Sequence, residues 1–170
     1  MNDNLFKSST FCALTEEYAL EISQWEYETP YDVYNFKGRP NGYLLDKSTW
    51  GTEQFCLVYK SIVIGQVACQ FDGNDLWVGW SLNPELCGKG RGFEFVSKCI
   101  LEIRKLKNFS GSIFLRVSAS NQRAVKAYQK AGFEYIETIQ DEIAYTNNIE
   151  DFWIMKHKCT VASICFITAR

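Results

Sequence analysis

A glycine-rich loop between an apolar run and an amphipathic helix is the strongest constraint on this fold. Leu76–Leu82 is a short, mostly apolar run that predicts a strand. Gly88–Gly92 follows, with glycine at every second position. Apolar residues three and four apart then predict a helix over Gly92–Lys107. A strand that leads into a helix commonly returns to the sheet by a crossover, so at least one parallel strand pair is expected.

Apolar runs bounded by polar turns predict the other strands, at 55–59, 62–71, 113–118, 133–139 and 152–155. The early runs are joined by short turns and should form an antiparallel meander with Leu76–Leu82. Thr15, before two glutamates and just after a short apolar run, is a typical helix N-cap. Asn121 opens a further helix that Gly132 ends. The aromatic segment Trp25–Trp50 is broken by prolines and glycines, which predicts short helical pieces and loops.

Length and composition indicate one domain. The chain has 170 residues, of which 46% are hydrophobic, enough to bury a core without disulfides or metal. We expect the domain to span residues 1–157. The apolar tail 158–170 is compatible with an added strand, with a subunit contact as in a homodimer, or with an aggregation-prone segment.

Charge and hydropathy exclude two classes of partner. The formal net charge of −2, without a dense block of lysine and arginine, argues against nucleic acid. No apolar run approaches the roughly 18 residues of a membrane span, and Met1–Thr10 is polar, unlike a signal peptide. A cytoplasmic protein without a membrane partner is therefore expected.

Cysteine and histidine content argues against a metal centre. The seven cysteines form no CxxC pair, and they stand at positions 12, 56, 69, 87, 99, 159 and 165. Free thiols in a reducing compartment are expected. The only histidine, His157, is predicted to lie on the surface after the last strand, and with one histidine no Cys/His zinc set is predicted.

The glycine loop has the residue types of an anion cradle. Glycine lets backbone N–H groups approach a phosphate, and the following helix N-terminus adds positive potential. Lys89 and Arg91 add charge. The spacing G-x-G-x-G matches neither the P-loop nor the dinucleotide fingerprint. By itself the loop is equally typical of a flexible strand-to-helix turn.

Two stretches in order resemble the signatures of the GNAT superfamily of acetyltransferases. Asn83–Gly92 resembles its acetyl-CoA loop, Q/R-x-x-G-x-G/A. The segment Leu115–Phe133 resembles V-x-x-x-N-x-R-A-x-x-x-Y-x-x-x-G-F. Trp25–Tyr34 is similar to a bacterial subgroup with W-x-Y-x-x-P-Y-x-x-Y. The likeness runs from about residue 55 to 155 and implies an α/β (α+β) fold with a mixed, mostly antiparallel sheet of six to seven strands and helices on both faces.

The resemblance also implies an activity: an N-acetyltransferase that moves an acetyl group from acetyl-CoA to a primary amine of a small molecule or peptide. It assigns the cofactor to Trp80, Ser81, Leu82, Cys87, Gly88, Lys89, Gly90, Arg91, Gly92 and Asn121. Cys87 stands where the family usually has glutamine or arginine, so weaker or altered cofactor affinity is expected. Tyr128 is the candidate acid for the departing thiolate; the alternative is a core aromatic.

The general base and the acceptor site are less readable. Leu76–Leu82 contains no carboxylate, so deprotonation would use water or an acid from the N-terminal region. A mixed acidic and aromatic cluster there suits a cationic amine, and its candidate substrate residues are Glu26, Glu28, Tyr31 and Asp32. Alternatively these acids are a solvated face. Two other functions stay open: a non-catalytic acyl-CoA-binding regulatory module, and an interaction domain without a ligand.

Overall fold

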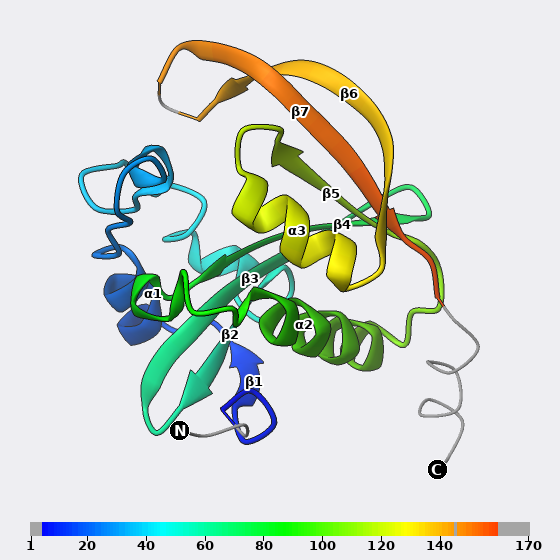
Figure 1. Ribbon diagram of the computed structural model, residues 1–170. Coiled ribbons are helices and arrows are strands. Elements are labelled where there is room, and N and C mark those ends of the chain that lie inside the picture. The colour runs from blue at the N-terminus through cyan, green and yellow to red at the C-terminus, as the bar shows by residue number, and fades with distance from the viewer. Residues whose placement is uncertain (1–4, 145, 160–170) are drawn as a thin grey trace.

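A seven-stranded mixed sheet forms the frame of the molecule (Figure 1). The computed structural model describes residues 5–144 and 146–159. The strands, in the spatial order β1-β2-β3-β4-β5-β7-β6, are β1 Thr10–Ala13, β2 Gln54–Tyr59, β3 Ile62–Asp72, β4 Asp75–Leu82, β5 Ile113–Ser118, β6 Phe133–Ile143 and β7 Asn148–His157. Only β4 and β5 pair in parallel; every other neighbouring pair is antiparallel. The predicted fold class is confirmed.

The helices begin and end at the residues whose side chains and backbones favour it. They are α1 Glu16–Ile22, α2 Gly92–Lys107 and α3 Gln122–Lys130, with 3-10 turns η1 Asp32–Tyr34, η2 Lys47–Thr49 and η3 Pro84–Leu86. Thr15 Oγ1 accepts a hydrogen bond from Tyr18 N at 3.3 Å, and Asn121 Oδ1 accepts one from Ala124 N at 3.2 Å. Gly132, with φ of +95°, follows the end of α3 as predicted.

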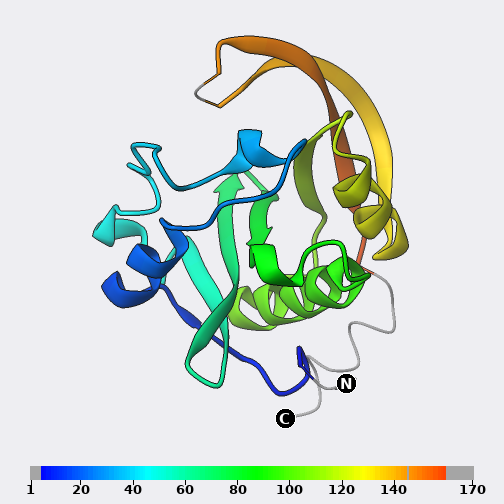
Figure 2. The same cartoon turned by 60° about the vertical axis from the view of Figure 1, so that its left-hand side comes forward.

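Two apolar cores cover the two faces of the sheet, because alternate strand residues point to opposite sides. In β2, Leu57 faces the core beneath α2 and α3, while Cys56 and Val58 face the core beneath α1. Phe95 and Val125 belong to the first core and Ile22 to the second. Figure 2 shows α2 across one face and the N-terminal helix on the other side. Helices therefore flank both faces, as expected.

The β6–β7 hairpin is longer than the apolar runs 133–139 and 152–155 indicate. Most of β6 is exposed, since it is an edge strand, and polar residues such as Glu142 continue its pairing up to Ile143 with Asn148. Because an exposed strand needs no apolar alternation, the hydropathy pattern ends before the hydrogen-bonded ladder does. The short β1 strand likewise shows in the sequence only as an apolar run.

His157 corrects a sequence-based expectation. It is the last residue of β7 and half-buried, not a surface residue after the strand. Its ring lies 5.3 Å from that of Phe133, and its Nδ1 is 3.3 Å from Arg104 Nη2. Burial lowers the pKa of His157, and the Arg104 charge acts in the same direction. Pairing with Phe133 across the β6–β7 ladder brings the ring to this site.

This lowered pKa predicts a loss of stability in acid. Because the folded protein binds the His157 proton more weakly than the unfolded chain does, the stability is fully present above the ordinary histidine pKa of about 6.5 and declines as the pH falls below it. We expect the melting temperature to fall between about pH 7.5 and about pH 5.5 by more in the wild type than in His157→Gln. Equal falls would contradict this role of His157.

Thiols, possible metal ligands, helix lengths and the start of the tail can be described for part of the chain. The six cysteines among the described residues are free thiols, and no group of three or more potential metal ligands occurs among residues 5–144 and 146–159. In the same part of the chain, no helix is long and apolar enough to cross a membrane. Of the predicted tail 158–170, Lys158 pairs with Glu134 at 3.3 Å, and residues 160–170 lie outside the described part.

Candidate active site

The sheet opens where its two parallel strands meet. β4 and β5 pair only at Leu76 with Ile113 and at Trp77 with Phe114. Beyond these pairs the strands separate (Figure 1), although β4 continues to Leu82 and β5 to Ser118. Backbone groups on one edge of β4 after Trp77 therefore have no strand partner on the β5 side. An extended polar ligand could pair with this edge.

A cavity of about 570 Å³ fills this opening. Its wall includes Leu115 and Val117, which face the core beneath α2 and α3. Arg116 and Ser118 also line it, and strand alternation directs them to the opposite face. The cavity thus reaches both faces of the sheet. Two ligands could enter it from opposite sides and meet between the strands.

The glycine loop forms one end of the cavity. Gly88 and Gly90 have φ values of +71° and +72°, a region that side chains disfavour. A Cβ at Gly92 would lie 2.9 Å from Ala127 Cβ, so glycine also permits the close packing of the loop on α3. Arg91 is the N-cap of α2 and makes no side-chain capping bond. The first N–H groups of this 16-residue helix are therefore left for an anion.

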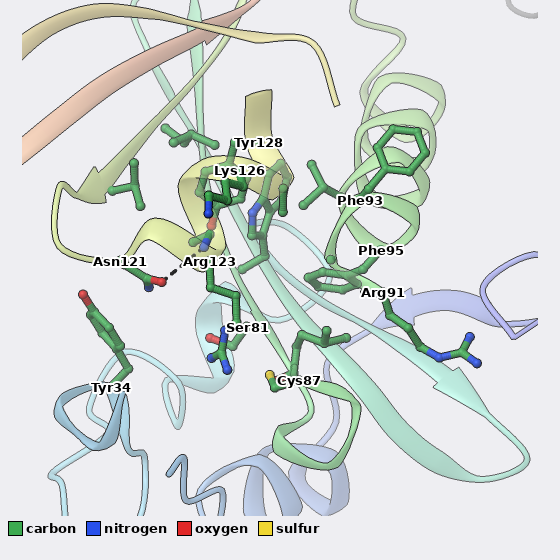
Figure 3. A pocket seen from close by; sticks show the side chains of 18 of the residues that line it. Tyr34, Ser81, Cys87, Arg91, Phe93, Phe95, Asn121, Arg123, Lys126 and Tyr128 are labelled. Carbon is green, nitrogen blue, oxygen red and sulfur yellow. Dashed lines mark hydrogen bonds between the residues drawn. The ribbon is translucent and has the colours of Figure 1, made fainter. Parts of the chain in front are cut away.

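The charge of the cavity wall has one sign. Among the described residues, the charged side chains of the wall are Arg91, Arg116, Arg123, Lys126 and Lys130, and none is a carboxylate. Figure 3 shows Arg123 and Lys126 on α3, whereas the Arg91 side chain extends away from the other labelled side chains and lies 3.9 Å from Glu94. Such a wall favours a ligand with several negative charges. The loop, the helix N-terminus and these cations together suit a phosphate-bearing ligand.

Tyr128 lies in the middle of the wall, on α3. Its ring is 6.1 Å from that of Trp80 and 5.9 Å from that of Phe133. Burial raises the pKa of Tyr128 to about 12, and the neighbouring Trp80 indole acts in the opposite direction. The hydroxyl is therefore kept protonated at neutral pH. It can donate a hydrogen bond to a group that gains negative charge.

The N-terminal segment closes the cavity on another side. The Tyr27 hydroxyl donates to Leu82 O at 3.1 Å and so ties this segment to the end of β4. Tyr34 lines the wall, and burial raises its pKa, while the polar side chains of Ser118 and Asn121 oppose the shift. The Cys87 thiol donates to the same Leu82 O at 3.7 Å, and burial raises its pKa. These contacts hold the loop and the aromatic segment together.

Most of the predicted cofactor residues line one cavity: Trp80, Ser81, Leu82, Cys87, Gly88, Gly90, Arg91, Gly92, Asn121 and also Tyr128. Lys89 is exposed and is not part of the wall. Asn121 has a second role, since its Oδ1 caps α3. The same wall contains Arg116 and Lys126, which had no predicted role, and Tyr27, which is the first tyrosine of the segment W-x-Y-x-x-P-Y-x-x-Y.

The predicted substrate residues lie outside the cavity wall, which takes Tyr27 and Tyr34 from their segment. Glu26 pairs with Lys37 at 3.0 Å, and Glu28 and Asp32 are exposed. The ring of Tyr31 lies 3.8 Å from the guanidinium carbon of Arg123, which is part of the wall. Tyr31 is therefore the member of this group that contacts the site through another side chain.

Comparison with known proteins agrees with this architecture. The model of the Acetyltransferase (GNAT) family matches residues 14–133, a span from the start of α1 through α3 to the first residue of β6. The chain belongs to this family. The match contains the glycine loop, the separated strands and Tyr128. The resemblance to the GNAT superfamily is thereby confirmed, and the likeness of Trp25–Tyr34 to a bacterial subgroup stays a prediction.

Solved structures with the same fold as this GNAT protein have acyl cofactors or amine substrates in their names. A mutant of the spermidine N-acetyltransferase SpeG from Vibrio cholerae has a TM-score of 0.66 at 17% identity and covers 88% of this chain and 93% of its own. The structure of yncA from Salmonella typhimurium, solved with its cofactor acetyl-CoA, has a TM-score of 0.62 at 13% identity. The match covers 91% of this chain and 95% of yncA. The structure of AAC(6')-Ib, solved with ribostamycin and coenzyme A, has a TM-score of 0.65 at 21% identity. The match covers 96% of this chain and 98% of AAC(6')-Ib.

Proposed function

We propose that this GNAT protein is an N-acetyltransferase that moves the acetyl group of acetyl-CoA to a primary amine of a small molecule or peptide. The cavity between the separated strands β4 and β5 is the observation that carries this proposal. It joins an anion-binding loop on one side to an aromatic wall on the other. The named activities of proteins with this fold, which include spermidine acetylation, support an amine acceptor.

The residues present fit acetyl-CoA. The backbone of the loop from Cys87 to Gly92 and the first turn of α2 would hold its phosphates, with Arg91, Lys126 and Lys130 adding positive charge. The free edge of β4 at 80–82 would pair with the amide groups of its pantetheine arm. When bound, acetyl-CoA supplies an activated acetyl group as a thioester.

The side chains have separate tasks in this proposal. The Tyr128 hydroxyl donates a hydrogen bond to the leaving sulfur as negative charge develops there. Tyr27 and Tyr34 exclude water from the reacting atoms and orient the acceptor from the N-terminal side. The neighbouring Glu26, Glu28, Tyr31 and Asp32 remain candidates for contacts with the distal part of a cationic acceptor, outside the wall.

A non-catalytic acyl-CoA-binding module is the second candidate. Two observations favour it: Cys87 in the loop, and a wall that contains no carboxylate among the described residues. A cytoplasmic location and a homodimer also stay proposals. Turnover separates the two functions, because both require cofactor binding and only an enzyme consumes the thioester.

The direct test is calorimetric titration of purified protein with acetyl-CoA and, for comparison, desulfo-CoA. We expect one-to-one binding of both. Release of free CoA thiol with a panel of primary amines then identifies the enzyme. Binding without thiol release for any amine would favour the non-catalytic module, and no binding at millimolar cofactor would contradict both functions.

A further inference from the structure

The cavity wall leaves one chemical requirement unmet. A primary amine is mostly an ammonium at neutral pH and must lose a proton before it can attack a thioester. The charged side chains of the described wall are all cations. The phenols of Tyr27, Tyr34 and Tyr128 are protonated, since burial raises their pKa. A group in the wall that connects it to a base elsewhere would meet this requirement.

Two serine hydroxyls form such a connection at the end of β5. Ser118 lines the cavity and is only 2% exposed. Its Oγ lies 2.7 Å from Ser120 Oγ and accepts a hydrogen bond from Ser120 N at 3.2 Å. Ser120 Oγ in turn donates to Glu150 Oε2 at 3.1 Å. A continuous line of hydrogen bonds thus runs from the cavity wall to a carboxylate on β7.

The two oxygens of the Glu150 carboxylate differ, because Oε2 accepts the hydrogen bond from Ser120 and Oε1 does not share it. Its Oε1 is buried and has no hydrogen-bond partner in the described ranges 5–144 and 146–159. Arg116, on the same face of the sheet, pairs with Asp141 instead. Burying a carboxylate oxygen without a hydrogen bond costs stability. A carboxylate retained at such a cost is a candidate for proton transfer. A paired cation would neutralise it and so remove its capacity to accept a proton.

The fold brings Glu150 to the acceptor side of the cavity. Ala119 N donates to Asp151 O at 2.8 Å, which holds the end of β5 against β7 beyond their last paired residues. The β6–β7 hairpin arches over toward the segment that carries Tyr34 (Figures 1 and 2). Glu150 is close enough to Tyr34 to influence its hydroxyl electrostatically. The carboxylate therefore lies near Tyr34, on the side of the cavity to which the N-terminal segment contributes wall residues.

We infer that Ser118, Ser120 and Glu150 form a proton relay that deprotonates the acceptor ammonium; this inference rests on the proposed function. The N–H bond of the ammonium breaks, and its electron pair stays on nitrogen. The proton moves to Ser118 Oγ, the Ser118 proton to Ser120 Oγ, and the Ser120 proton to Glu150 Oε2. An ammonium and a carboxylate become a neutral amine and a carboxylic acid, which returns its proton to solvent after product release.

Two acceptors of different charge test the relay through the release of CoA thiol from acetyl-CoA. 2-Phenylethylamine is an ammonium at neutral pH, whereas hydroxylamine is mostly uncharged and needs no prior deprotonation. We expect Glu150→Gln to lower kcat for 2-phenylethylamine at least about tenfold, with KM changed less than about twofold. With hydroxylamine the loss should be less than about twofold. The substitution keeps the size of the side chain and removes its negative charge together with its capacity to take a proton.

Two further variants define the path. Ser120→Val removes the middle hydroxyl and fills its space with methyl groups, so it should reproduce the pattern of Glu150→Gln. Asp151→Asn is the matched control: this carboxylate is adjacent in β7 but exposed, and its side chain bonds Gln140. Asp151→Asn should change neither the rate with 2-phenylethylamine nor the rate with hydroxylamine. Acetyl-CoA affinity of all variants should match the wild type, and melting curves should show each variant folded at the assay temperature.

The outcomes separate the relay from the function on which it rests. Equal losses with both acceptors, a rise in KM alone, or full activity of Ser120→Val would overturn the relay. So would wild-type kcat in Glu150→Gln. If the wild type releases no thiol with either acceptor or with any other amine, the proposed function fails and the relay fails with it.

Discussion

Replacement of Tyr128 by phenylalanine is expected to lower kcat for acetyl transfer at least about tenfold, with acetyl-CoA affinity changed less than about twofold. The ring stays between Trp80 and Phe133, so packing is preserved. What is lost is a hydroxyl that burial keeps protonated, with a pKa of about 12. A donor of this kind helps most when charge develops on the leaving sulfur. Rates from thiol release and affinities from calorimetry measure the two quantities.

Tyr135→Phe is the matched control for the loss of a tyrosine hydroxyl. Tyr135 lies on the exposed edge strand β6, where its hydroxyl is 3.0 Å from Thr138 Oγ1, and it is not part of the cavity wall. The kcat of Tyr135→Phe for acetyl transfer should equal that of the wild type. If Tyr128→Phe also kept the wild-type rate, Tyr128 would be a core aromatic and not the acid.

Gly90→Asp is expected to weaken acetyl-CoA binding at least about thirtyfold, equal to about 2 kcal/mol. Open space surrounds the Cβ position, with nothing within 4 Å, so the new carboxylate would occupy the cradle itself. It would repel the phosphates and block the approach of the loop backbone. The φ of +72° at this position adds backbone strain. Calorimetric titration with acetyl-CoA measures the loss.

Gly73→Asp separates the cradle from the general cost of an aspartate in this conformation. Gly73 lies in the β3–β4 turn with φ of +59°, and nothing lies within 4 Å of its Cβ position either. The substitution there carries the same strain and the same added charge, away from the cavity. Its acetyl-CoA affinity should stay within about twofold of the wild type. A Gly90→Asp protein that binds like this control would place the cofactor elsewhere.

Local signals made much of this site readable from the sequence. The bounds of α2 were predicted as Gly92–Lys107 and are the observed ones. The Asn121 cap and Gly132 defined α3 equally well, because helix periodicity, caps and turns depend on neighbouring residues. The same locality explains why the loop and Tyr128 could be named in advance. That the loop and Tyr128 belong to one site was inferred only from the family resemblance.

Residues that reach the site through long-range pairing could not be named in advance. Arg116 and Ser118 face one side of β5 and Val117 the other, and a shift by one residue would exchange them. Glu150 meets Ser120 only because β7 pairs with β5 in the observed register. The two residues are 30 positions apart, and the chain between them gives no local signal of that contact.

Local signals in the sequence thus determined the strand, the glycine loop and the helix that follows it, and the helix that carries Tyr128, while motif resemblance indicated the acetyltransferase family. The tertiary structure alone decided where β4 and β5 separate, which cations line the cavity, and which carboxylate is linked to it. The physical reason is that strand register and the divergence of strands depend on packing across the whole sheet. No short segment of the chain contains that information.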